Sequence, residues 1–317
     1  MFALRTSPLA RSGSQPGRFL VGAALLCLLS NAATAAPAGP DATDLYIPKE
    51  VRPTCERIAG KLSSVSLGDC LSRPLQPTGS YSINGTPILL AEYPPLPTRE
   101  PLGRVLLVGG IHGDEYSSVS IVFKWLAMLD RFHSGLFHWH VTPLMNPDGL
   151  LRRPSQRMNG RGVDLNRNFP SPNWLMEAED YWVRRTSRNP RRYPGPAPLS
   201  EPESQWLYDE IEAFKPSVIV SVHAPSHVVD YDGPSDPPKK LGPLYLKLMG
   251  TYPGSLGRYA GVHRGLPVVT IELPSAGIMP TAAQQNQIWV DLVRYLRVNV
   301  PKVAFLGSGS SVSGAAR

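Results

Sequence analysis

Short apolar segments recur through the middle of the chain and alternate with segments of helical periodicity. The segment Val218-Ile219-Val220 offers no polar side chain to solvent on either face, which is typical of a strand in a sheet covered on both sides. The alternation predicts an α/β fold: a single domain with a mixed, mostly parallel central sheet covered by helices on both faces. In such sheets, functional groups gather at the carboxyl ends of the strands.

The periodicity predicts where the main strands and helices lie. The strands are Arg104–Val108, His138–Leu144, Ser217–Val222 and Pro267–Leu273. The helices are Tyr116–Asp130, Glu201–Phe214, Ser255–Val262 and Ala282–Val298, with a shorter one at Ile58–Val65. For the second of these, Ser200 is the expected N-cap, with Pro202 in the first turn and Glu203 at the capping-box position.

Two connecting segments have patterns of their own. The pair Asn84-Gly85 predicts a tight turn, with a strand before it and the return strand Ile88-Leu89-Leu90 after it, forming an edge hairpin. Residues 173–198 lack periodicity and predict a long irregular loop. This loop holds Arg184, Arg185, Arg188, Arg191 and Arg192. The basic cluster either meets carboxylates of a substrate or lies in solvent, and the sequence leaves both roles open.

The amino terminus has the pattern of a secretory signal peptide. Three arginines precede the apolar run Phe19–Leu29, and Ala33-Thr34-Ala35 forms an A-x-A-like cleavage site, so we expect cleavage after Ala35. An uncleaved anchor is the alternative, although the run is too short to span a bilayer comfortably. The chain is therefore expected to be secreted across the inner membrane into the periplasm, without stable membrane insertion after cleavage.

Export changes the interpretation of charge and cysteines. The signal segment carries three Arg and no acidic residue, so the net charge of +7 becomes 7 − 3 = +4. This modest excess argues against nucleic-acid binding. Only Cys55 and Cys70 remain after cleavage, and two cysteines close in sequence in an oxidising compartment predict a disulfide.

Candidate zinc ligands follow the first long apolar strand, in Gly109-Gly110-Ile111-His112-Gly113-Asp114-Glu115. Glycines at the end of a strand permit a sharp turn that presents side chains. His112 and Glu115 are both good zinc ligand types, but a catalytic zinc site needs a third protein ligand. By itself, this pair is more typical of a polar loop before a helix than of a metal site.

His223 is the candidate third ligand, because it follows the apolar strand at Val218–Val222 as His112 follows the earlier one. Of the seven histidines, only these two come directly after an apolar strand. Glu272 is a carboxylate within the apolar segment Val268–Leu273. A buried carboxylate without a role is costly, so Glu272 is a candidate general base, although a structural ion pair with an arginine would also explain it.

Polar residues alternate in the segment between these candidates. Asp164 is a candidate partner for the second ring nitrogen of a zinc-bound histidine. Arg157 is a candidate for stabilising an oxyanion. Asn166 and Arg167 are candidates for binding a substrate carboxylate, because a guanidinium offers a bidentate fork.

These elements together resemble the zinc metallocarboxypeptidases of the M14 type, over about residues 80–298. The resemblance rests on His112-Gly113-Asp114-Glu115, Asn146-Pro147-Asp148-Gly149, Gly162-Val163-Asp164-Leu165-Asn166-Arg167-Asn168-Phe169, Ser200-Glu201-Pro202-Glu203, Ser221-Val222-His223 and Thr270-Ile271-Glu272-Leu273. Within the family, the segments Tyr252–Gly257 and Gly265–Pro274 are similar to the murein peptide amidase branch, whose members cut the γ-D-glutamyl–meso-diaminopimelate bond.

The resemblance implies a role for each candidate residue. It implies one zinc per chain, held by His112, Glu115 and His223, with Glu272 as general base and proton shuttle. Asn166 and Arg167 match the pair that binds the substrate carboxylate, and Asp164 matches the partner of the first histidine. Arg157 is the preferred arginine for polarising the scissile carbonyl, with Arg152 and Arg153 as alternatives. A covering tyrosine is left open among Tyr245, Tyr252 and Tyr259.

The residue patterns predict the organisation of the chain, and the resemblance implies its activity. We expect a signal peptide (1–35), a leader and Cys-stapled lead-in (36–80), a zinc peptidase domain (81–300) and a disordered tail (301–317). The expected activity is hydrolysis of an amide bond next to a free carboxylate in peptidoglycan peptides. The alternatives are a general metallocarboxypeptidase acting on protein C-termini, a desuccinylase- or aspartoacylase-like amidohydrolase, and a wall-binding protein without catalysis. The oligomeric state is left open.

Overall fold

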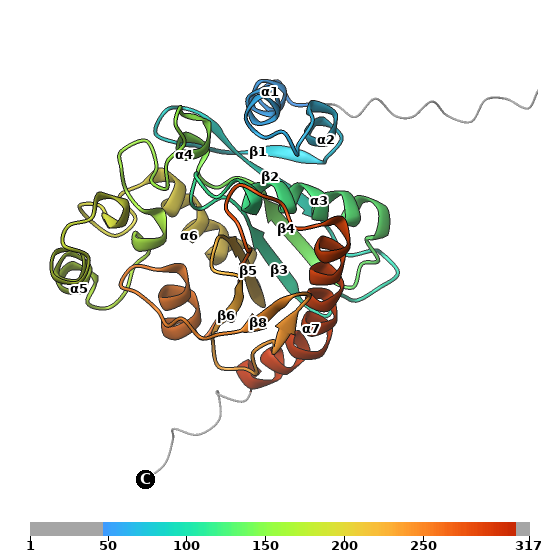
Figure 1. Cartoon of the computed structure of the whole chain (residues 1–317). Coiled ribbons are helices and arrows are strands. Elements are labelled where there is room, and N and C mark those ends of the chain that lie inside the picture. Colours follow the sequence, from blue (N-terminus) through green and yellow to red (C-terminus); the bar gives the residue numbers. More distant parts are fainter. Residues whose placement is uncertain (1–46, 309–317) are drawn as a thin grey trace, which may run out of the picture. The chain divides into compact units, whose positions relative to one another are not determined.

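The computed structural model describes the backbone of residues 47–308 and the side chains of residues 47–300 (Figure 1). The predicted signal peptide, the start of the leader and residues 309–317 of the predicted tail lie outside the described residues. Within the described residues, no helix has the length and apolar character needed to cross a membrane.

A nine-stranded mixed sheet forms the centre of the fold, in the order β1-β2-β4-β3-β5-β9-β6-β8-β7. The strands are β1 (Leu75–Tyr81), β2 (Pro87–Tyr93), β3 (Arg104–Val108), β4 (His138–Thr142), β5 (Val218–His223), β6 (Val228–Asp232), β7 (Lys240–Leu241), β8 (Leu244–Leu246) and β9 (Val268–Glu272). The four central strands, β4-β3-β5-β9, are parallel, and β1, β2 and β6 join through antiparallel pairs. The predicted α/β class and mixed sheet are confirmed.

Helices cover the sheet on both faces (Figure 1). The main helices are α3 (Tyr116–Phe132), α6 (Pro202–Phe214), the π-helical segment η4 (Gly257–His263) and α7 (Ala282–Ser308). Alternate residues of β3 pack in separate cores: Val105 and Leu107 contact the core that contains α3 and α7, whereas Leu106 and Val108 contact the core that contains α6 and η4. Each fully buried aliphatic side chain stabilises the fold by about 1.5–3 kcal/mol, which explains why Val105–Val108 of β3 offer no polar side chain on either face.

The lead-in contains two helices, α1 (Val51–Lys61) and α2 (Leu67–Leu71), joined by the predicted disulfide between Cys55 and Cys70. Both cysteines are fully buried. The prediction of one helix at 58–65 is wrong. Helix α1 starts seven residues earlier and ends at Lys61, and Ser66 is the N-cap of the separate helix α2. Ser66 accepts the Asp69 N–H, and the Asp69 carboxylate accepts the Ser66 N–H, in a capping box.

Several local predictions are corrected. The hairpin is present at the sheet edge, but its first strand begins at Leu75, and Ser82–Thr86 forms the turn. Residues 173–198 contain α5 (Trp174–Asp180), the π-helical η2 (Tyr181–Arg185) and the 3₁₀ helix η3 (Pro190–Arg192), so this segment is not an irregular loop. Helix α7 extends ten residues beyond the predicted end at Val298, into the predicted tail.

The predicted cap of α6 is also wrong. Glu201, not Ser200, is the N-cap residue, and its side chain makes no capping hydrogen bond. The Ser200 hydroxyl instead donates to Glu201 and accepts from the Asn168 side chain. Because the Ser200 hydroxyl is hydrogen-bonded to the Asn168 and Glu201 side chains, it does not cap the N-terminus of α6. The other main strands and helices agree with the prediction within two residues, apart from η4, which is π-helical.

Candidate metal centre

Three neighbouring parallel strands bring the candidate ligands and the candidate base to one edge of the sheet. His112 follows β3 after a three-residue glycine-containing turn, while His223 and Glu272 are the last residues of β5 and β9. The strand register pairs His223 directly with Glu272. Adjacent parallel strands end at the same edge, so residues far apart in the sequence meet there.

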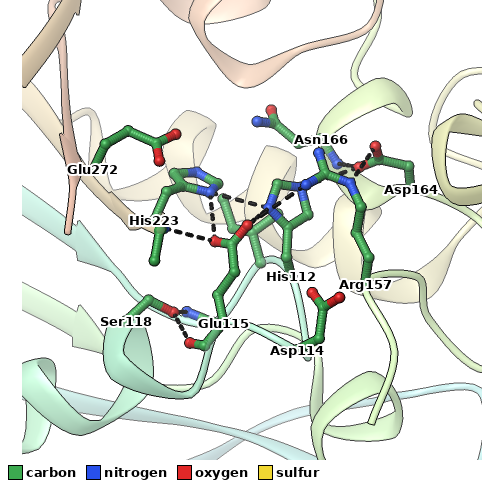
Figure 2. Close-up of polar contacts among 12 residues, drawn as sticks. His112, Asp114, Glu115, Ser118, Arg157, Asp164, Asn166, His223 and Glu272 are labelled. Carbon is green, nitrogen blue, oxygen red and sulfur yellow. Dashed lines mark hydrogen bonds and ion pairs between the residues drawn. The ribbon is translucent and has the colours of Figure 1, made fainter. Parts of the chain in front are cut away.

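His112, Glu115 and His223 converge on one point (Figure 2). The Nδ1 atoms of the two histidines lie 3.1 Å apart. The Glu115 carboxylate lies 2.8 Å from Nδ1 of His112 through Oε1 and 3.1 Å from Nδ1 of His223 through Oε2. All three side chains are buried, with at most 5% exposure. This buried group of two imidazoles and a carboxylate can hold a metal ion.

The hydrogen-bond partners of the two Nε2 atoms show which ring nitrogens of His112 and His223 are free to coordinate a metal. Nε2 of His112 lies 3.2 Å from Asp164 Oδ1, and Nε2 of His223 lies 3.0 Å from the Ser221 hydroxyl. A hydrogen on Nε2 of His112 would be donated to Asp164, leaving Nδ1 free to coordinate. Two imidazole lone pairs and a carboxylate then face the same point. That donor set fits zinc and leaves a fourth coordination position for another ligand.

The carboxylates in this centre are held ionised. Burial raises the pKa of Asp164, but the nearby Arg157 and His112 have the larger combined effect and hold it well below its usual value. Burial likewise opposes ionisation of Glu115, yet the two histidines lower its pKa overall. An ionised Glu115 is the form that can coordinate a cation.

Arg157 is tied into the same centre. Its Nε donates to Asp164 Oδ2 at 2.9 Å, and its Nη1 lies 3.5 Å from Glu115 Oε1. The Asn146 side chain donates to the carbonyl oxygens of both Ile111 and Arg157, linking the two loops. Gly113 permits this approach, because a Cβ there would lie 2.1 Å from the backbone of Gly149.

An open cleft of about 210 Å³ borders the centre. It is lined by the three candidate ligands together with Arg157, Asn166, Arg167 and Glu272. Glu272 lies beside His223, on the side opposite Asp164 (Figure 2). The expectation that Glu272 is buried is wrong, since its position at the strand end leaves it half-exposed to the cleft. Its Oε2 accepts the Ser226 N–H.

Arg167 is the clearest unsatisfied group in the cleft. Its side chain is 5% exposed and stacks over Tyr252, with the guanidinium carbon 4.4 Å from the ring centre. Its Nε has no hydrogen-bond partner among the described residues. Asn166 is held by the Leu256 N–H, which donates to its side-chain oxygen at 2.8 Å. A buried arginine that lines a cleft and has an unpaired Nε is suited to an anionic ligand.

The cleft separates the alternatives that the sequence left open. Arg157 lines it, whereas Arg152 and Arg153 are exposed and do not. Of the three candidate tyrosines, Tyr252 lines the cleft, Tyr245 is 63% exposed, and Tyr259 is buried with its hydroxyl donating to Glu212.

Sequence reasoning missed several residues of the cleft and its support. Arg192, whose role the sequence left open within the arginine-rich segment, reaches the cleft, and its Nη1 lies 4.0 Å from Asp164 Oδ2. Asp230 and Asp232 also line the cleft. Nothing in their local sequence marks them.

A buried polar network supports the loop that carries Asp164. The Asn159 side chain donates to the carboxylates of both Glu201 and Glu203, at 2.7 and 3.1 Å. Both glutamates are almost completely buried. Burial is the largest influence on Glu203 and raises its pKa from 4.5 to about 7. Its ionisation is therefore unfavourable in the folded protein.

We expect Glu203 to make the stability of the protein pH-dependent. The folded protein retains this proton up to about pH 7, whereas the unfolded chain loses it near pH 4.5. Stability from this group is thus present below pH 4.5 and is lost as the pH rises through 7. A shift of this size corresponds to about 3 kcal/mol. Urea unfolding between pH 4.5 and 8 should show a flatter pH dependence for Glu203→Gln than for the wild type.

The exposed Glu100→Gln variant is the matched control for this measurement, and it should retain the wild-type pH dependence. Parallel curves for Glu203→Gln and the wild type would show that Glu203 titrates normally in the folded protein.

Comparison with known proteins agrees with this geometry. The zinc carboxypeptidase family matches residues 80–241. Murein peptide amidase A of Vibrio campbellii is 33% identical over 221 residues, covering 68% of this chain and 85% of that protein. The Escherichia coli K12 protein of the same name is 34% identical over 180 residues, covering 53% and 70%. Bovine thrombin-activatable fibrinolysis inhibitor has the same fold, with a TM-score of 0.56 at 17% identity, covering 81% of this chain and 96% of that one.

Proposed function

Because the chain belongs to the zinc carboxypeptidase family and is a metallopeptidase, we propose that it is an exported enzyme that hydrolyses an amide bond in peptidoglycan peptides. The proposed bond lies next to a free carboxylate and is of the γ-D-glutamyl–meso-diaminopimelate type. The names of the related murein peptide amidases support the substrate class. The observation that carries the proposal is the convergence of a zinc-type donor set, a neighbouring carboxylate and an unsatisfied arginine in one cleft.

We assign His112, Glu115 and His223 to a single zinc ion per chain. Bound zinc supplies a Lewis acid that lowers the pKa of a coordinated water to about 7. Asp164 would fix the ring of His112, because its carboxylate lies within hydrogen-bond distance of Nε2. Ser221 would do the same for His223.

Glu272 is the proposed general base. It would take a proton from the attacking water and deliver that proton to the leaving nitrogen, so that the amide is replaced by a carboxylate and an amine. Its place beside His223 in the cleft supports this assignment. The Ser226 N–H would orient the carboxylate through the hydrogen bond to Oε2.

Two arginines are proposed to bind the substrate. Arg157 would polarise the scissile carbonyl, since its guanidinium lines the cleft and is anchored by Asp164. Arg167 would bind a free carboxylate of the substrate together with Asn166, and Tyr252 would cover the bound residue. The contact between Tyr252 and the Arg167 guanidinium supports Tyr252 over the other candidate tyrosines.

Export is proposed from the amino-terminal pattern and agrees with the disulfide between Cys55 and Cys70. The enzyme would then act in the periplasm, where intact wall peptides as well as released fragments are accessible.

Side-by-side digestion tests the proposed function. Purified protein should contain about one zinc per chain, and it should release the diaminopimelate-containing product from defined muropeptides, as identified by mass. Ordinary peptides with free C-termini should be poor substrates. Faster trimming of ordinary C-termini would instead identify a general metallocarboxypeptidase. If the protein consumed neither substrate, the proposed hydrolysis would be contradicted.

A further inference from the structure

Two carboxylates in the cleft have no role in the proposed hydrolysis. Asp230 and Asp232 lie two residues apart on β6, so their side chains project from the same face of the sheet. The strand pairs antiparallel with β9, placing Asp230 opposite Thr270 and Asp232 opposite Val268. Both carboxylates line the cleft that contains Glu272.

The strand register places this acidic pair deeper along the sheet than the proposed base. Glu272 is two residues beyond Thr270 on β9. At about 3.3 Å per residue, Asp230 lies about 7 Å along the strand direction from the level of Glu272, and Asp232 lies about 7 Å further. A long side chain of a residue bound next to Glu272 would extend towards these carboxylates.

Asp232 has no compensating cation in the described part of the chain. Among the described residues, none donates a hydrogen bond to its carboxylate or forms an ion pair with it. Burial and the neighbouring Asp230 raise the pKa of Asp232 to about 6. Asp230 is 4% exposed and its Oδ1 accepts the N–H groups of Tyr231 and Met249. Partly buried carboxylates without a counter-ion are unfavourable, so a cation from outside the chain would stabilise the pair.

The packing around Asp232 leaves room for its carboxylate. Helix η4 carries Gly257 and Gly261 where it meets this side chain. A Cβ on Gly257 would lie 2.0 Å from Asp232 Oδ2, and one on Gly261 would lie 2.5 Å from Asp232 Cβ. Glycine at both positions therefore lets the helix cover Asp232 without displacing it from the cleft.

The same cleft offers a site of the opposite charge. Arg157, Arg167 and Arg192 all line it, and the unpaired Nε of the buried Arg167 indicates an anionic ligand. A single bound residue that carries both a free carboxylate and a side-chain ammonium would satisfy both groups. A neutral side chain would leave the acidic pair uncompensated.

We propose that Asp230 and Asp232 bind the side-chain ammonium of the substrate residue on the leaving side of the scissile bond. The enzyme would thereby select a diamino acid at this position. This inference rests on the proposed function and adds the residues that determine its specificity.

Three tripeptides with the zinc-loaded enzyme test the inference: L-Ala-γ-D-Glu linked to meso-diaminopimelate, to L-lysine or to L-norleucine. Norleucine has the unbranched chain without the ammonium. For the wild type, kcat/KM should be at least about tenfold higher with either ammonium-bearing peptide, mainly through KM. Asp232→Asn should lower kcat/KM about tenfold for those two peptides and leave the norleucine peptide unchanged, which also shows that the variant is folded. Asp230→Asn should likewise lower the ratio of kcat/KM for the ammonium-bearing peptides to kcat/KM for the norleucine peptide.

The exposed Asp209→Asn variant on α6 is the matched control and should behave as the wild type. Equal hydrolysis of the lysine and norleucine peptides by the wild type would overturn the inference, as would an equal loss on all three peptides in Asp232→Asn. Hydrolysis of none of the three would instead contradict the proposed function, and this inference with it.

Discussion

Replacing Glu272 with Gln is expected to lower kcat by about a thousandfold while the protein keeps its zinc. Gln has nearly the same size, and its side-chain oxygen can still accept the Ser226 N–H, so the cleft should keep its shape. It cannot take up the proton of the attacking water. A thousandfold loss corresponds to about 4 kcal/mol of transition-state stabilisation. The measurement combines kcat on a defined muropeptide with zinc content by elemental analysis.

Zinc content separates a catalytic role from a metal-binding role for Glu272. The three candidate zinc ligands are His112, Glu115 and His223, so the Glu272→Gln variant should bind zinc as the wild type does. The exposed Glu100→Gln variant controls for the loss of one carboxylate elsewhere on the protein. Full activity in Glu272→Gln would show that another group moves the proton, and loss of zinc would assign Glu272 to the metal site.

Replacing Arg167 with Gln is expected to raise KM by about a hundredfold, with a much smaller change in kcat. The buried guanidinium has an Nε without a partner, and a substrate carboxylate would supply that partner as well as the opposite charge. Arg167→Lys should give an intermediate KM, because lysine keeps the charge but loses the planar fork. Steady-state kinetics on the lysine- and diaminopimelate-containing tripeptides measures both effects.

A substrate change provides the sharper control for Arg167. When the free carboxylate of the peptide is converted to an amide, the wild type and Arg167→Gln should bind it with similar, weak affinity. The exposed Arg185→Ala variant tests whether any arginine of this region has the same effect, and it should retain the wild-type KM. An unchanged KM in Arg167→Gln would remove Arg167 from carboxylate binding.

The fold was largely predictable because its signals are local. Continuous apolar strands such as Val218-Ile219-Val220 can be stable only when both faces of a sheet are covered, and helices α3 and α6 have clear periodicity. The errors occurred where tertiary contacts override local preference. Ser200 has the chemistry of an N-cap, but Asn168 and Glu201 compete for its hydroxyl. The segment 173–198 has little periodicity, yet it forms short helices.

The candidate site divides in the same way. The sequence alone determined the residue types at the ends of the strands, including His112, His223 and Glu272, because a strand's apolar pattern shows where it ends. Neighbouring parallel strands end at the same edge of a sheet, so the sequence also predicted that these three residues lie in one site. Their catalytic and zinc-binding roles remain predictions.

Only the tertiary structure decided which remaining side chains face the cleft. Arg157 lines the cleft whereas Arg152 and Arg153 do not, and Arg192, Asp230 and Asp232 line it as well. The physical reason is that these positions depend on the register between β6 and β9 and on the packing of long loops. A one-residue change of register would turn Asp230 and Asp232 to the other face of the sheet, and no local pattern in the sequence specifies that register.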